Sequence, residues 1–71
     1  MKGKLVRDIA TVQMEGKTGR ITAVLLKDTL VSCVPVDETQ RDFKVIVLSG
    51  KHKDKTFFLQ KWQIRMYVQE E

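Results

Sequence analysis

The stretch Val6–Leu26, VRDIATVQMEGKTGRITAVLL, decides the fold, because it holds two apolar runs joined by glycines. In the first run, Val6–Met14, apolar residues recur at alternate positions and only Asp8 interrupts them, which predicts a strand with one apolar face. Glu15–Gly19 predicts a turn, because its two glycines permit positive φ angles. Arg20–Leu26 then predicts a second strand.

A helix is the alternative for the first of these runs, because Leu5, Ile9 and Val12 also recur at helical spacing. The side-chain inventory favours strands: Val, Ile and Thr together supply 19 residues, whereas Ala supplies only two. Branched side chains lose rotamer freedom on a helix and pack well on a pleated sheet. We therefore predict that the chain is mainly β-sheet.

Three further strands are predicted after this stretch. The polar segment Lys27–Thr29 suits a tight hairpin, and the charged loop Asp37–Asp42 and the turn Gly50–Lys55 separate the later runs. Alternation of period two from Trp62 onward extends the last strand, although a helical turn around Leu59–Trp62 would break it in two. The predicted strands are Leu30–Val36, Phe43–Ser49 and a fifth that starts at Thr56 and runs to Gln69.

Five short strands at spacings of about 10–12 residues predict an all-β fold, a small five-stranded antiparallel barrel. Closing the sheet removes exposed edges, which matters most in a domain with few residues. Pro35 cannot donate to a strand ladder, so its end of the third strand is expected at an edge or a bulge. No repeat or linker divides the chain, so residues 1–71 are expected to form one domain.

Charge is distributed unevenly along the 71 residues, which carry 13 Lys and Arg against nine Asp and Glu. Residues 1–27 hold six basic and two acidic side chains, and residues 44–68 hold six basic and one acidic. The intervening residues 28–43 hold four acidic side chains and one basic. Such a distribution favours interaction with polyanions or with an acidic partner.

Several classes of protein are not expected from this sequence. The chain is too short for a dinucleotide-binding α/β fold, and no run approaches the roughly 18–20 apolar residues of a membrane span. A signal peptide is not expected, because Met1–Lys4 is followed by the charged residues Arg7 and Asp8. Cys33 is the only cysteine, which excludes an internal disulfide framework and fits a reducing cytoplasm. We expect a soluble cytoplasmic protein without a membrane partner.

Residues 8–21, DIATVQMEGKTGRI, resemble the KOW-type opening of SH3-like barrels. In that pattern an Asp leads an alternating strand, a glycine turn follows, and a second glycine precedes a branched apolar residue. The residues in these roles are Asp8, Ala10, Val12, Gly16, Gly19 and Ile21. The resemblance implies a Tudor or SH3-like barrel that binds RNA, DNA or a nucleic-acid-associated protein.

The residues that could support catalysis or hold a metal are few. A zinc site needs about four ligands, and His52 and Cys33 are the only histidine and cysteine. Cys33 lies in an apolar run, where a free cysteine behaves as a small hydrophobe. The carboxylates Asp37, Glu38 and Asp42 lie in a charged loop, where solvation is the ordinary explanation. The GKTG turn lacks the longer glycine frame of a phosphate loop. We predict no enzyme activity, no metal and no cofactor.

The basic turn Lys51–Lys55, KHKDK, is the most specific surface feature. Its three ammonium groups and one imidazole cannot be buried unpaired, so they are expected in solvent. Phosphate oxygens are natural partners for them, because neutralising phosphates releases counterions. Lys17 and Arg20 lie at the other glycine turn and are expected to join the same surface. A solvated hairpin tip is the alternative.

The aromatic residues divide between core and surface. Phe57 and Phe58 are adjacent, so in a strand they point to opposite faces and one of them is expected to face outward. Trp62 is expected in the core, because Ile64 and Met66 continue its face.

Tyr67 shares its parity with Arg65 and is therefore the aromatic expected at the surface, where it would stack a base beside Lys61. We predict a non-catalytic nucleic-acid-binding module. Its predicted contact residues are Lys17, Arg20, Lys51, His52, Lys53, Lys55, Lys61, Arg65 and Tyr67.

A small protein-interaction domain is the alternative function, acting as a regulator, inhibitor or assembly factor. The sequence shows no catalytic cluster, and the acidic segment 28–43 would repel phosphate if it shared the basic face. Aromatic and Arg side chains are common anchors of protein interfaces. The small core and one outward phenylalanine also leave a homodimer open.

Overall fold

The computed structural model covers residues 1–71 and consists of one antiparallel sheet and a single short helix. Its elements in chain order are β1 (Lys2–Leu5), β2 (Ile9–Gly16), β3 (Gly19–Leu25), β4 (Leu30–Pro35), β5 (Asp42–Val47), β6 (Thr56–Gln60), α1 (Lys61–Tyr67) and β7 (Val68–Glu70). Every strand pair is antiparallel. The prediction of an antiparallel β fold is therefore confirmed.

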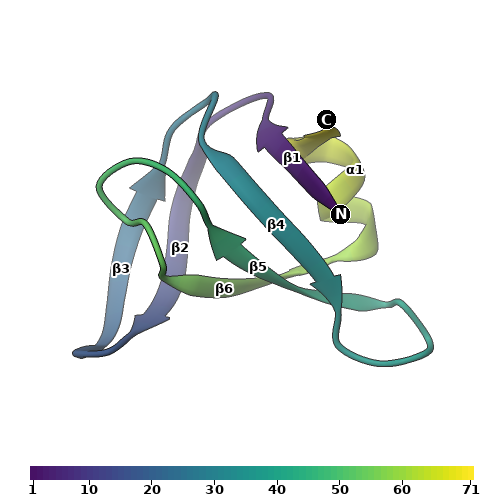
Figure 1. The fold of residues 1–71 in the computed structure, drawn as a ribbon, viewed down its shortest axis with the longest axis horizontal. Helices are drawn as coiled ribbons and strands as arrows, with labels where there is room; N and C mark the ends of the chain where they lie inside the picture. Colours follow the sequence, from purple (N-terminus) through teal and green to yellow (C-terminus); the bar gives the residue numbers. More distant parts are fainter.

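The sheet has seven strands in the order β3-β2-β6-β5-β4-β1-β7, and its two edge strands do not pair with each other. The predicted five-stranded closed barrel is therefore not what the strand pairing gives. Figure 1 shows the strands curving around an interior, with α1 and both chain ends on one side. The seven-residue helix α1 does not meet the length and hydropathy needed to cross a membrane.

The interior of the sheet is filled by one apolar cluster. Phe57 is 2% exposed and belongs to this cluster, whereas its neighbour Phe58 is 58% exposed. The predicted opposite orientation of the two rings is thus confirmed. The buried members are Leu5, Ile9, Val12, Met14, Leu25, Val31, Cys33, Val45, Val47, Phe57, Leu59, Ile64 and Val68.

The predicted strand Val6–Met14 is wrong at its beginning. β1 ends at Leu5, the chain bends, and β2 starts at Ile9. A register shift then separates Ile9 from Val12 in the pairing with β3. A bulge of this kind inserts a residue and reverses the parity, so Ile9 and Val12 are both buried while Ala10 is exposed. Simple alternation therefore assigns Ala10 to the wrong face.

The middle of the chain matches its predicted strands and turns closely. β3, β4 and β5 lie within one or two residues of the predicted runs, and residues 50–54 form the predicted turn. Pro35 pairs with Phe43 in β5, whereas the pairing of β1 with β4 reaches only to Ser32. The missing N–H of Pro35 therefore falls where β4 has a partner on one side only, as expected for proline.

The predicted strand from Trp62 is wrong, because α1 occupies Lys61–Tyr67. The Gln60 backbone N–H donates to Oε1 of Gln63 at 2.9 Å, and the Gln60 side chain accepts from the Gln63 backbone N–H. This reciprocal pair is a capping box, which satisfies donors left free at a helix start. The helix Lys61–Tyr67 also contains Lys, Gln, Arg and Met residues, which are good helix formers.

Helical spacing also explains the burial pattern in this segment. Ile64 is buried in the core, and Tyr67, three residues later in the helix, packs against the core partly buried. Trp62 and Met66 are four residues apart and are exposed together. Core contacts at helical spacing thus outweigh the period-two pattern of the sequence.

Candidate nucleic-acid interface

The predicted contact residues form two groups at opposite ends of β6. The turn residues 51–55 precede Thr56, and Lys61 and Arg65 follow Gln60. β6 spans four residue steps from Thr56 to Gln60, which separates its ends by about 13 Å. The structure therefore does not gather the predicted contact residues into one patch.

The first group lies on the β5–β6 turn and is spread along the β2–β3 hairpin. A Cβ placed on Gly16 would stand 3.3 Å from Cγ of Lys55, so the stem of Lys55 runs beside the turn that carries the exposed Lys17. Lys51 borders Leu25 at the other end of β3, so Lys17 does not join the whole basic turn on one surface as expected. We call Lys51, Lys53 and Lys55 the tip cluster. Arg20 lies at the β2–β3 hairpin, where its Nε atom donates to Oε1 of Glu15 at 3.2 Å in the one ion pair of the structure.

Two predicted contact residues are only partly exposed. His52 is half-buried beside Leu25 and Leu26, and its Nδ1 atom is buried without a hydrogen-bond partner. Tyr67 packs against the core partly buried, and its carbonyl accepts from the Val6 N–H at 2.8 Å. His52 and Tyr67 are therefore less exposed than the sequence predicts.

The second group surrounds a cavity of about 720 Å³ between the loop after β4 and the start of α1, which we call the α1 cavity. Arg41, Lys61 and Arg65 supply three positive charges to it, and Asp42 supplies the one negative charge. None of these four side chains forms an ion pair. The residues around the cavity are Thr39, Gln40, Arg41, Asp42, Gln60, Lys61, Trp62 and Arg65.

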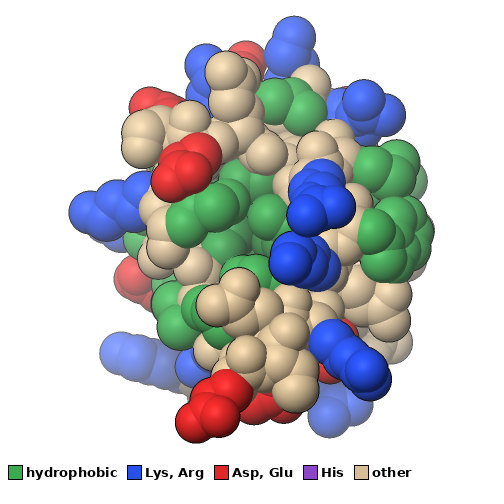
Figure 2. Space-filling model, turned by 90° about the vertical axis from the view of Figure 1, so that its right-hand side faces the viewer, with side chains coloured by type: hydrophobic (Ala, Val, Ile, Leu, Met, Phe, Trp, Pro, Cys, Tyr) green, Lys and Arg blue, Asp and Glu red, His purple; other side chains and the backbone are tan.

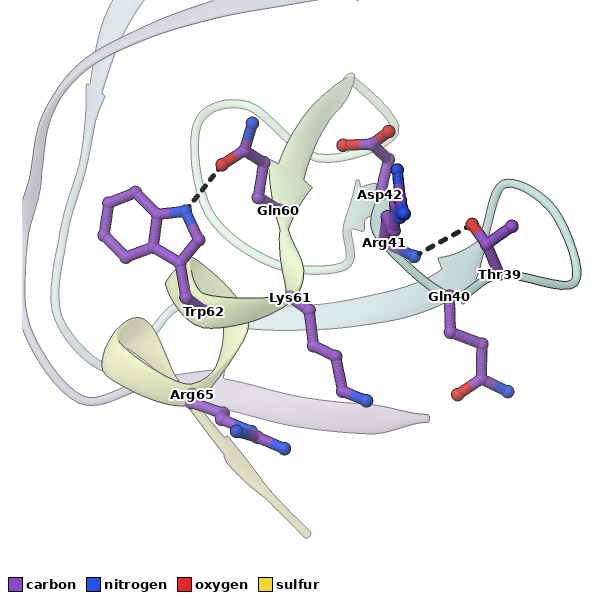
Figure 3. A pocket seen from close by; sticks show the side chains of 8 residues that line it. All are labelled: Thr39, Gln40, Arg41, Asp42, Gln60, Lys61, Trp62 and Arg65. Carbon is purple, nitrogen blue, oxygen red and sulfur yellow. Dashed lines mark hydrogen bonds between the residues drawn. The ribbon is translucent and has the colours of Figure 1, made fainter.

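The side chains around the α1 cavity differ in direction. Figure 3 shows Lys61 and Arg65 pointing to the same side, with Trp62 turned the other way beside Gln60. Figure 2 faces this end of the molecule and shows Lys and Arg side chains next to apolar ones. Positive charge and apolar surface are thus adjacent here.

Hydrogen bonds hold the two walls of the α1 cavity together. The Lys61 backbone N–H donates to the Arg41 carbonyl at 2.9 Å, which fixes the loop against the helix start. Nε1 of Trp62 donates to Oε1 of Gln60, which orients the indole. Trp62 is 56% exposed, so its predicted place in the core is wrong.

The loop that carries Arg41 is shaped by Asp37. Its Oδ1 atom accepts from the Thr39 backbone N–H at 2.9 Å and from the Thr39 hydroxyl. Its carbonyl accepts from the Gln40 N–H at 3.3 Å, and Gln40 has a φ of 56°. The hydrogen bonds from the Thr39 hydroxyl and N–H favour the ionised carboxyl, so they hold the pKa of Asp37 below its ordinary value of 3.8.

We expect Thr39→Ala to raise the pKa of Asp37 toward its ordinary value, because it removes the hydroxyl donor. Since the pKa of Asp37 is lower in the folded state, its ionised carboxyl stabilises the fold. This stabilisation is complete above the unfolded-state pKa and is lost as the pH falls through the folded-state pKa. An NMR titration of the Asp37 carboxyl carbon measures the change. Thr39→Ser keeps the hydroxyl and is the control; an unchanged Asp37 pKa in Thr39→Ala would contradict the assignment.

Two observations bear on metal binding and on nucleophilic attack. No three His, Cys, Asp or Glu side chains lie close enough together to hold a metal ion. Burial raises the pKa of the Cys33 thiol, although the nearby positive amino terminus partly opposes this. A raised pKa disfavours the thiolate that nucleophilic attack requires.

Two residues of the α1 cavity are not predicted from the sequence. Arg41 lies in an acidic segment, and period-two alternation places Trp62 in the core. Gln63 supplies only the second half of the usual capping-box signature, because Gln60 stands where Ser, Thr, Asp or Asn is usual, so the sequence does not mark this helix start clearly. Comparison with protein-family models, with curated proteins and with solved structures found no match for this chain.

Proposed function

We propose that this chain is a non-catalytic nucleic-acid-binding module that contacts phosphates through the α1 cavity. The observation that carries the proposal is that Arg41, Lys61 and Arg65 all line one cavity and that none of them has an ion-pair partner. Unpaired surface cations bind phosphates with release of counterions. The exposed indole of Trp62 at the same cavity adds a surface on which a base can lie.

We also propose that residues 8–21 are a KOW-type hairpin and that the sheet is a variant of the SH3-like barrel. β2 and β3 pair around the turn between Gly16 and Gly19, as such a hairpin requires. Oδ1 of Asp8 accepts from the Lys27 backbone N–H at 2.7 Å, which ties the start of β2 to the end of β3. A structural role of this kind suits the Asp that leads the pattern.

Binding is expected to weaken steeply with salt. Three phosphate contacts on a single strand correspond to a slope of about −2 in log K against log salt. A rise from about 50 to about 200 mM salt then weakens binding roughly 20-fold. Fluorescence anisotropy of a labelled oligonucleotide measures the slope, and a strand of the same length with a neutral backbone is the control. A slope near zero, or equal binding of the neutral strand, contradicts phosphate contact.

A protein partner is the second candidate, and the edge strand β3 favours it. β3 pairs only with β2, so one side of its backbone is free. Val24 and, just beyond the strand, Leu26 are 50% and 63% exposed along this edge. A free edge can accept a strand from another protein. A pull-down from nuclease-treated lysate separates the candidates: a stoichiometric protein favours this one, and loss of all partners favours nucleic acid.

A further inference from the structure

We infer that the nucleic acid bound at this site is single-stranded and lies along β6, with one base stacked on Trp62 and another on Phe58. The inference rests on the proposed function and names its ligand class and its contact path.

The outward face of β6 brings the two exposed rings together. Phe57 and Leu59 are buried, so Phe58 and Gln60 occupy the opposite face of the strand. Phe58 is 58% exposed there. Nε1 of Trp62 donates to the Gln60 side chain, which draws the indole toward this same face. Phe58 and Trp62 therefore flank Gln60 on one exposed surface.

Each ring borders a cavity with charged side chains near it. Trp62 borders the α1 cavity with its three cations and Asp42. Phe58 borders a second cavity of about 230 Å³, which the ion pair of Arg20 and Glu15 also lines. Lys44 is exposed directly opposite Phe58 in the pairing of β5 with β6. Each aromatic face thus has a positive charge close by for the phosphate that accompanies a base.

Strand β6 connects the tip cluster with the cations of the α1 cavity. The tip cluster lies before Thr56 and the α1 cavity after Gln60, with Phe58 at the middle of the strand. A polyanion lying along β6 therefore meets positive charge at both ends and aromatic surface between them. Positive charge along the path of the backbone, together with aromatic stacking surfaces, is the usual way in which proteins bind a single strand.

A single strand fits these rings and a duplex does not. The faces of bases inside a duplex are already stacked on their neighbours, so a side chain reaches only their edges. Bases of a single strand are free to lie on an aromatic ring, and each such contact is worth about 5- to 150-fold in affinity. Exposed rings without a partner, as at Phe58 and Trp62, suit the unpaired strand.

The test uses Trp62, which is the only tryptophan of the chain, as a fluorescent probe. The full chain is titrated with oligothymidylate, with an abasic strand of the same length and with a duplex of that length. We expect the oligothymidylate to quench the fluorescence, the abasic strand to bind at least about tenfold more weakly without quenching, and the duplex to bind more weakly than the single strand.

Variants identify the two rings through the anisotropy of a labelled oligothymidylate. Trp62→Ala and Phe58→Ala are each expected to lose about tenfold in affinity, whereas Trp62→Phe and Phe58→Tyr keep a ring and most of the affinity. Circular dichroism checks that each variant is folded. Equal binding of the abasic strand without quenching overturns the stacking inference and leaves the phosphate contacts standing. If the protein binds none of the three ligands, the proposed function is overturned as well.

Discussion

Phe57→Ala is expected to lower the free energy of unfolding by about 3–5 kcal/mol, whereas Phe58→Ala leaves it nearly unchanged. Phe57 is 2% exposed and lies opposite Val45 at the centre of the core. Truncating a buried phenylalanine to alanine costs about 3–5 kcal/mol in lost burial and cavity formation. A domain of 71 residues has a free energy of unfolding of about 4–11 kcal/mol, so this single loss is a large fraction of the total.

The adjacent ring supplies the matched control for this prediction. Phe58 has the same side chain on the same strand, but it is 58% exposed. Its truncation removes few packing contacts and is expected to cost less than about 1 kcal/mol. Urea denaturation followed by far-ultraviolet circular dichroism gives both free energies of unfolding. Equal losses for Phe57→Ala and Phe58→Ala would show that β6 is not oriented as described.

The double variant Lys61→Glu/Arg65→Glu is expected to lose at least about 25-fold in affinity for a single-stranded oligonucleotide at about 0.1 M salt. Each lost phosphate contact removes about 0.7 from the salt exponent, and two such losses give this factor at that salt concentration. Glu at position 61 begins α1, where a negative charge is favourable, and Glu at position 65 costs only a small amount near the helix end. The variant is therefore expected to remain folded.

The control variant is Lys51→Glu/Lys53→Glu, which makes the same change in net charge within the tip cluster. It is expected to lose less affinity, because a strand seated at the α1 cavity meets the tip cluster only at its far end. Anisotropy titrations of both variants across a salt series measure the affinities and the slopes. An equal or larger loss of affinity in Lys51→Glu/Lys53→Glu would show that the principal contact lies at the β5–β6 turn, as predicted from the sequence.

Much of the middle of the chain was predictable, because its pattern is local. The apolar runs Arg20–Leu26 and Leu30–Val36 form strands as expected, and Pro35 lies where the sheet does not need its N–H. The opposite faces of Phe57 and Phe58 follow from the period of a strand alone. Such features depend on residues adjacent in the chain.

The C-terminal segment was not predictable from its period. Trp62–Gln69 alternates cleanly, yet residues 61–67 form a helix that buries Ile64 in the core and packs Tyr67 against it. The choice between two local patterns was therefore decided by what each pattern could pack against.

The amino-acid sequence by itself determined the β-rich class, the excess of basic residues and the positions of most strands and turns. Only the tertiary structure decided which charges meet, because strand register and chain reversal bring together residues that are distant in sequence. Arg41 joins Lys61 at one cavity in this way, while the lysines of the β5–β6 turn lie at the far end of β6. Composition sets how much positive charge the surface carries, and the pairing of distant strands sets where it gathers.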